Sequence, residues 1–408
     1  MPSTHTAVKP GRPIPGVQDH HSNHFVAEHA QTRPGLEQPC PFRGARERGT
    51  SCNQYGLRME GAMLRAFHWT RTQLPARCPP IGPHIQERQK LAESVRKACI
   101  EVGFFYIKNH GIDGELIDRT FEAAHNFFAL SKEQKMECCL AKSKNFRGYS
   151  PLYGEKPSNP ELEKPAQGAL SEAFDIGYEL AGDIRKGPGD LPPQDEYGLH
   201  GVNQWPDERL LPGFRKVYLE YFSQALELSR KLIRMIALAL DQEEDFFDSA
   251  VEYPGVFSRM LHYPPQPVEG QEIPGQAAHT DWEFFTILAQ DRVPALQVRN
   301  NQGHWVAAPP IPGSLVVNIG DCLATWSDNR FKSTIHRVVN LTGEERYSIP
   351  FFFGVDYNTT ISVLGDMGSG ENPSCRKPFT AGEYVLQKLS NAYIGYDRDR
   401  EHGAKKDV

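Results

Sequence analysis

The sequence predicts a mixed α/β fold of the α+β type, in which helices back a jelly-roll sandwich or barrel of β-strands. Residues 81–250 are helix-rich, because apolar positions recur there at helical spacing, whereas residues 251–360 contain short β-rich runs separated by Gly and Pro turns. Evenly spaced short strands are typical of sandwiches and barrels. At 408 residues the chain is long enough to bury a large core.

The helix-rich region is expected to start with a helix that ends near Gly103, since apolar residues are spaced by three and four over residues 91–102. The apolar run 104–107 predicts a buried strand directly after it. Ser131 and Gln134 form a capping-box pattern, which predicts the start of another short helix.

Residues 145–200 are rich in Pro and Gly and are expected to be mostly loops. A single apolar stripe along residues 217–236 then predicts a long helix that supports a sheet. Near the end of the chain, Thr380 and Glu383 form a second capping-box pattern, which predicts a helix reaching Tyr393.

The strands of the jelly roll are expected where β-branched and aromatic residues cluster between turns. The expected strands are 259–263, 285–288, 315–319, 334–339 and 347–353.

Composition excludes several classes of function. A net charge of −6 gives no reason to expect a nucleic-acid partner. No apolar run approaches the ~20 residues that span a bilayer, so no membrane association is expected, and residues 1–30 lack the apolar segment of a signal peptide. The eight cysteines show no disulfide or zinc spacing, which favours a reducing, cytoplasmic location. Residues 1–80 lack periodicity and are expected to be a disordered extension.

A metal site is predicted by His279 and Asp281. These side chains lie at i and i+2, so on an extended strand they point to the same face and can bind one ion. His336, in the β-rich run 333–339, is the best candidate for a third ligand. Two imidazoles and one carboxylate leave positions of an octahedron open, which suits Fe(II) that binds a co-substrate and dioxygen.

A carboxylate site is predicted beside this metal. Arg346 and Ser348 again share one strand face, and the turn at 340–344 predicts a hairpin that places Arg346 opposite His336. An arginine fork and a hydroxyl near an open iron form a seat for a carboxylate, as a chelating 2-oxo acid requires. The alternative for Arg346 is a surface ion pair with a neighbouring glutamate.

Residues 259–353 resemble the 2-oxoglutarate/Fe(II) dioxygenases of the isopenicillin N synthase-like family. The spacing of His279, Asp281, His336 and Arg346 matches that family as well. The matching segments are Leu261-His-Tyr-Pro-Pro265, His279-Thr-Asp281, Leu288-Ala-Gln-Asp291, Leu296-Gln-Val298, Gly303-His-Trp305, Val316-Val-Asn-Ile-Gly-Asp321, Lys332-Ser-Thr-Ile-His-Arg-Val338 and Arg346-Tyr-Ser348. Upstream, Gly103-Phe-Phe-Tyr-Ile-Lys-Asn-His-Gly111 and Phe146-Arg-Gly-Tyr149 resemble the family's N-terminal region, so the resemblance covers residues 85–400.

The resemblance implies a double-stranded β-helix core over residues 251–360, preceded by an N-terminal dioxygenase region over 81–250. It also implies ferrous iron, dioxygen and 2-oxoglutarate as co-substrate, with 2-oxoglutarate anchored by Arg346 and Ser348 and contacted by Tyr263. The C-terminal segment 361–408 is then expected to be a lid helix and tail, because an iron-bound oxidant must be shielded from water.

This sequence departs from the family at two places. Many members carry Asn two residues before the tyrosine, where this chain has Leu261. One expected hydrogen bond to 2-oxoglutarate is therefore missing or supplied by another residue. The usual N-terminal strand, which reads Ile-Pro-x-Ile-Asp, is not found before Ile85.

The expected function is oxidation of a small organic molecule, an amino acid or a secondary metabolite, by hydroxylation, desaturation or ring closure with release of succinate and CO₂. Three alternatives remain at this point. They are an oxidase that uses no 2-oxoglutarate, a non-catalytic jelly roll that binds a small ligand, and a zinc hydrolase with the same ligands. The substrate and the oligomeric state are not determined by the sequence.

Overall fold

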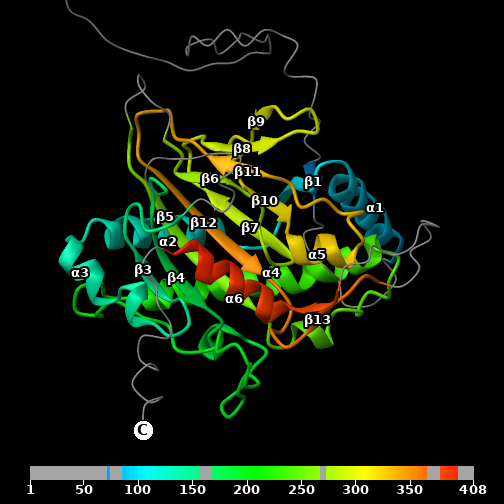
Figure 1. Cartoon of the computed structure of the whole chain (residues 1–408), viewed down its shortest axis with the longest axis horizontal. Helices are drawn as coiled ribbons and strands as arrows, with labels where there is room; N and C mark the ends of the chain where they lie inside the picture. The colour runs from blue at the N-terminus through cyan, green and yellow to red at the C-terminus, as the bar shows by residue number, and fades with distance from the viewer. Residues whose placement is uncertain (1–70, 74–84, 157–167, 267–272, 365–376, 394–408) are drawn as a thin grey trace, which may run out of the picture. The chain divides into compact units, whose positions relative to one another are not determined.

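Two β-sheets face each other in the part of the chain that this computed structural model describes, residues 71–73, 85–156, 168–266, 273–364 and 377–393. The larger sheet has the strand order β1-β2-β10-β7-β12-β5-β4-β3, and the smaller has the order β6-β11-β8-β9. A ribbon of β13 and β14 stands apart (Figure 1). This arrangement is the predicted jelly roll.

The strand bounds follow in chain order. They are β1 (Arg71–Gln73), β2 (Phe104–Lys108), β3 (Gly148–Ser150), β4 (Glu172–Gly177), β5 (Val256–Tyr263), β6 (Gln276–His279), β7 (Phe285–Gln290), β8 (Leu296–Arg299), β9 (Trp305–Ala307), β10 (Ser314–Ile319), β11 (His336–Val338), β12 (Arg346–Phe353), β13 (Thr360–Ile361) and β14 (Phe379–Thr380).

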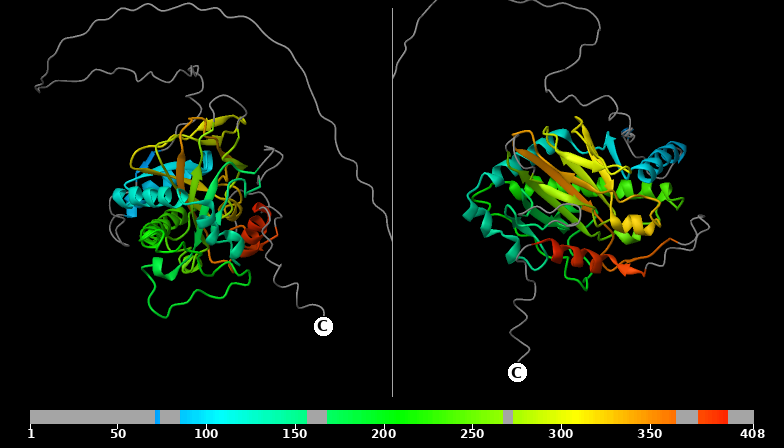
Figure 2. Two further views of the ribbon diagram at one scale, coloured as in Figure 1. Left: turned by 90° about the vertical axis from the view of Figure 1, so that its left-hand side faces the viewer. Right: turned by 45° about the horizontal axis from the view of Figure 1, so that its top comes forward.

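The helices are grouped around the larger sheet. The long helix α4 and the C-terminal helix α6 lie on opposite sides of it in both views (Figure 1, Figure 2). The α-helices are α1 (Ile85–Glu101), α2 (Gly114–Phe128), α3 (Lys132–Glu137), α4 (Phe214–Ala239), α5 (Asp321–Trp326) and α6 (Ala381–Ala392), with short 3₁₀ turns at Leu140–Lys142, Leu180–Gly182 and Ser249–Val251. Within the described residues no helix combines the length and apolarity needed to cross a membrane.

The central strands of the larger sheet are buried on both faces, and β2 shows how. Phe105 and Ile107 belong to the core shared with the helices, whereas Phe104 and Tyr106 belong to the core between the two sheets. Successive side chains of a strand point to opposite faces, so a strand covered on both sides is apolar throughout. The run 104–107 therefore forms the predicted buried strand.

On β12 the same alternation places core residues on one face of the strand and polar residues of the site on the other. Phe351 and Phe353 are fully buried in the helix-side core. Arg346 and Ser348 point to the other face, toward the smaller sheet, where they line a cavity. The inner face of the larger sheet thus holds the polar residues of the site.

Several expectations about local structure were wrong. Residues 71–73, expected to be disordered, form β1, which pairs in parallel with β2. A strand held at a sheet edge by backbone hydrogen bonds needs no apolar pattern, and Arg-Thr-Gln has none. The rest of the segment 1–80 lies outside the described residues. The described part of the region 145–200 is mostly loops, as predicted, but it also contains β3 and a fully buried β4.

The helix at the C-terminus is confirmed, but its capping box is not. Thr380 is the N-cap of α6, yet its side chain caps no backbone N–H. The Thr380 hydroxyl instead forms a hydrogen bond with the hydroxyl of Tyr197. The capping box at Ser131 and Gln134 is present as predicted.

Gly103 provides a test of the junction between α1 and β2. Its φ is +76°, and a Cβ there would lie 2.0 Å from the carbonyl oxygen of Lys332. We expect Gly103→Ala to lower the free energy of unfolding by about 3 kcal/mol, measured by urea denaturation, because left-handed strain and overpacking add. Gly111→Ala is the matched control, since Gly111 has φ +82° but open space around it. Equal losses in the two variants would contradict the steric argument.

Candidate active site

The three predicted metal ligands converge on one point. His279 ends β6 and His336 begins β11, and the two are paired directly across these antiparallel strands. Their ring centroids are 4.2 Å apart. Asp281 lies two residues beyond β6, with its Oδ1 3.6 Å from His279 Nε2 and 3.5 Å from His336 Nε2. The ligand atoms of all three lie within 4.8 Å of one another.

Hydrogen bonds to the backbone orient both imidazoles. His279 Nδ1 donates to the carbonyl oxygen of Ala277 at 2.7 Å, and His336 Nδ1 donates to that of Thr334 at 3.1 Å. A proton held on Nδ1 leaves Nε2 with a free lone pair directed at the shared point. The histidines are therefore held in the tautomer that binds a metal.

The carboxylate of Asp281 is held in a similar way. Its Oδ2 accepts hydrogen bonds from Asn318 Nδ2 at 2.6 Å and from the hydroxyl of Thr286. Oδ1 is left facing the histidines. Burial raises the pKa of Asp281, but the facing histidines and these hydrogen bonds outweigh burial and hold the pKa below its usual value.

Burial and the facing His279 lower the pKa of His336 to about 4. The imidazole is thus neutral at physiological pH, which is the form that binds a metal. Two imidazoles and one carboxylate, with the remaining directions open, suit Fe(II).

The predicted carboxylate seat lies in a cavity of about 70 Å³ that the three ligands also line. Arg346 is 0% exposed, and its Nη2 donates to Gln290 Oε1 at 3.0 Å. Its Nε and Nη1 have no hydrogen-bond partner among the described residues. A buried guanidinium with free donors is costly unless a ligand satisfies them, which fits an anionic carboxylate.

Tyr263 and Ser348 complete this seat. The Arg346 guanidinium carbon lies 4.7 Å from the centre of the Tyr263 ring, and Ser348 Oγ donates to the Tyr263 hydroxyl at 3.4 Å. Both residues line the cavity with Arg346. All six residues singled out from the sequence therefore surround one space.

Comparison with known families now bears on this geometry. Residues 251–355 match the family model described as the 2OG-Fe(II) oxygenase superfamily, and residues 79–208 match the one described as non-haem dioxygenase in morphine synthesis N-terminal. A 2-oxoglutarate-Fe(II) type oxidoreductase of Emericella nidulans is 36% identical over 325 residues, covering 77% of this chain and 88% of that protein. The chain belongs to the 2OG-Fe(II) oxygenase superfamily.

Other relatives agree with this assignment. A homoarginine-6-hydroxylase of Glycine max is 36% identical over 313 residues. The match covers 75% of this chain and 90% of that protein. A full-length Neurospora crassa protein solved with alpha-KG has a TM-score of 0.64 and 29% identity, covering 75% of this chain and 92% of that one. The enzyme therefore uses Fe(II), 2-oxoglutarate and dioxygen, and the family decides against the oxidase, the binding protein and the zinc hydrolase.

The strand pairing of Arg346 differs from the pairing predicted from the sequence. The hairpin expected to set Arg346 opposite His336 does not exist, because β11 pairs with β6 and β8 while β12 pairs with β5 and β7. Each strand already has neighbours on both edges, so the turn at 340–344 carries the chain from one sheet to the other. Arg346 is paired with Tyr263 and reaches the metal ligands across the space between the sheets.

A smaller difference concerns Asp281. It lies after the end of β6 rather than on the strand, and its backbone carbonyl accepts a hydrogen bond from the N–H of Asp321 at 2.8 Å. The sequence analysis also gave no role to Asn318, Thr286 or Gln290. Asn318 and Gln290 stood within the matching segments, which was the available signal.

On another side of the ligands lies a second cavity of about 90 Å³, lined in part by His279, Asp281 and Trp282. It contains a buried ion network in which Arg259 pairs with Asp175, at 2.7 Å from Nε to Oδ1, and with Glu155. Glu283 also lines it. Burial raises the pKa of Glu283 to about 8, an effect that the charge of Arg147 only partly opposes.

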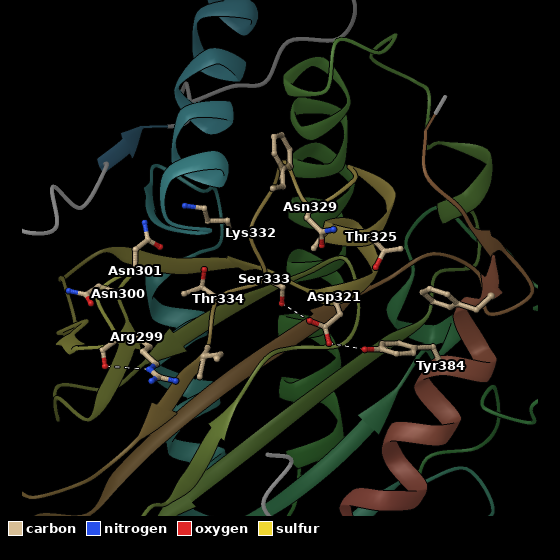
Figure 3. A pocket seen from close by; sticks show the side chains of 15 residues that line it. Arg299, Asn300, Asn301, Asp321, Thr325, Asn329, Lys332, Ser333, Thr334 and Tyr384 are labelled. Carbon is tan, nitrogen blue, oxygen red and sulfur yellow. Dashed lines mark hydrogen bonds between the residues drawn. The ribbon is translucent and has the colours of Figure 1, made fainter. Parts of the chain in front are cut away.

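Asp321 connects the loop that follows β6 to the C-terminal helix α6. Figure 3 shows its contact with Tyr384 on that helix. Asp321 accepts hydrogen bonds from Ser333 Oγ at 2.7 Å, from the Tyr384 hydroxyl at 2.8 Å and from Thr280 Oγ1 at 3.2 Å. Thr280 stands between two metal ligands, and Tyr384 is on α6. Asp321 borders an open depression of about 730 Å³ that none of the three ligands lines, so this larger hollow is not the reaction site.

We expect His336→Ala to abolish stoichiometric iron binding and turnover, because two protein ligands bind Fe(II) far more weakly than three. Iron content after anaerobic reconstitution and succinate release would measure this. His304→Ala is the control, since His304 is exposed and lies on no ligand-bearing strand. Near-normal iron content in His336→Ala would refute its assignment as a ligand.

Proposed function

We propose that this oxygenase holds one Fe(II) with His279, Asp281 and His336, and oxidises an unactivated C–H bond of a small organic molecule. The outcome would be hydroxylation, desaturation or ring closure. Iron and 2-oxoglutarate, when bound, supply the oxidising chemistry, and 2-oxoglutarate leaves as succinate and CO₂. The observation that carries the residue assignment is the buried Arg346, whose free donors line the same cavity as the three ligands.

The residues around the first cavity would bind 2-oxoglutarate. Arg346 and Ser348 would hold the distal carboxylate of 2-oxoglutarate, and Tyr263 would contact the same molecule. Leu261 lines this cavity and contributes no polar group. Gln290 accepts from Arg346 Nη2, and the donors on Nε and Nη1, which no described residue satisfies, remain available to the carboxylate.

The substrate would occupy the second cavity, which shares His279 and Asp281 with the first. Its walls include Trp282, Phe352 and Leu389 of α6. Apolar walls exclude water from the metal, and α6 would act as a lid over this space. The hydroxylation of homoarginine named for one relative supports an amino acid as one substrate class, and a secondary metabolite is the other.

Arg346→Ala tests the co-substrate site. The iron-loaded wild-type enzyme should bind 2-oxoglutarate without oxygen and show the weak visible charge-transfer band of the chelate. We expect Arg346→Ala to lose this band while keeping its iron, and Arg346→Lys to bind weakly because a lysine has no fork. Arg119→Ala, at an exposed ion pair, is the control. A wild-type enzyme with no band and with turnover independent of 2-oxoglutarate would contradict the proposal.

Tyr384→Phe tests the lid. It removes one hydrogen bond between α6 and Asp321, which stabilises the closed position by roughly 1–2 kcal/mol. We therefore expect 2-oxoglutarate decay that is not coupled to substrate oxidation to rise several-fold, with iron content unchanged. Tyr253→Phe, at a residue that packs against Tyr178 rather than α6, is the matched control. Unchanged coupling in Tyr384→Phe would show that this anchor does not hold a lid.

A further inference from the structure

Glu283 is a buried acid that has no hydrogen-bond partner for one oxygen in the part of the chain that the structure describes. Its side chain is 5% exposed, and it lines the second cavity together with the metal ligands His279 and Asp281. Glu283 Oε2 is shielded from solvent and has no hydrogen-bond partner among the described residues. Buried carboxyl groups are almost always paired, so one that lines a cavity without a partner points to a ligand group that completes it.

The other carboxylates of this cavity are already satisfied. Arg259 binds Asp175 and Glu155, while Tyr393 donates to Asp175 Oδ2 at 3.1 Å and Gln276 donates to Glu155 Oε2 at 3.2 Å. This network leaves Arg259 no role toward Glu283.

Arg147 is the nearest competing explanation, because its charge acts on Glu283. Its guanidinium carbon lies 3.8 Å from the centre of the Phe257 ring, and its Nη2 donates to the carbonyl oxygen of Leu199 at 3.0 Å. These contacts hold Arg147 in place, and the described residues show no ion pair between it and Glu283.

The charges that line the cavity lean toward the acidic side. Apart from Asp281, which faces the metal, the lining includes the acids Glu155, Asp175 and Glu283 but only the cations Arg259 and Lys156. Trp282 and Phe352 also line the cavity, and aromatic rings can attract cations through their faces.

We propose that Glu283 is the residue that recognises the substrate, and that the substrate carries a basic nitrogen, an amine or a guanidine, which donates a hydrogen bond to it. Because Glu283 and the metal ligands line one cavity, the oxidised carbon belongs to the same small molecule as this nitrogen. The inference rests on the proposed function of the site.

Matched ligand pairs test it: benzylamine against benzyl alcohol, and L-arginine against L-citrulline. Each would be titrated by calorimetry, without oxygen, into the full chain loaded with Fe(II) and 2-oxoglutarate. We expect the basic member of at least one pair to bind roughly tenfold or more tightly than its neutral partner, as a charged hydrogen bond implies. No preference for a basic member in either pair would overturn the proposal.

The variant Glu283→Gln keeps the shape of the side chain and should remove this preference. Glu122→Gln makes the same change at an exposed position of α2 and should retain it. A preference for the basic ligand that survives in Glu283→Gln would overturn the proposal. If the melting temperature of this variant also fell, Glu283 would instead be a structural partner of Arg147. The charge-transfer band of bound 2-oxoglutarate is recorded separately, and its absence in the wild type would refute the proposed function instead.

Discussion

The site depends on strands that are buried on both faces. In β12 and β10, alternate side chains fill the core under the helices, and the intervening ones face the smaller sheet. The first set anchors the strands rigidly through apolar burial. Polar residues such as Arg346, Ser348 and Asn318 can therefore project into the space between the sheets with little freedom of backbone movement. Rigid placement of polar groups is what a metal site requires.

The polar groups between the two sheets divide into those whose hydrogen bonds the protein satisfies and those with atoms that no described residue satisfies. Asp281 Oδ2 and the Nδ1 atoms of both histidines are satisfied by neighbours, which leaves one free ligand atom on each of these residues. Arg346 and Glu283 differ, because each is buried with polar atoms that no described residue satisfies. They lie in two cavities that share His279 and Asp281, so a ligand in either one would lie beside the proposed metal ligands.

The C-terminal helix belongs to the site as well as to the fold. Leu389 and Tyr393 line the second cavity, and the Tyr393 hydroxyl joins its ion network through Asp175. At its other end, the Tyr384 hydroxyl donates to Asp321 (Figure 3). Asp321 also accepts a hydrogen bond from Thr280, which stands between the proposed metal ligands His279 and Asp281. A movement of α6 would therefore change both the second cavity and the loop that carries Thr280 and Asp281.

The sequence by itself predicted the residues that we propose as metal ligands and anchoring arginine, because the period of two in a strand fixes which side chains share a face. The family resemblance supplied the identity of the co-substrate. Only the tertiary structure decided that β11 pairs with β6 rather than with β12, that Asn318 and Thr286 hold Asp281, and that no described residue satisfies Glu283 Oε2. Alternation specifies the face of a strand but not its neighbour, since pairing between distant strands depends on which edges are already occupied.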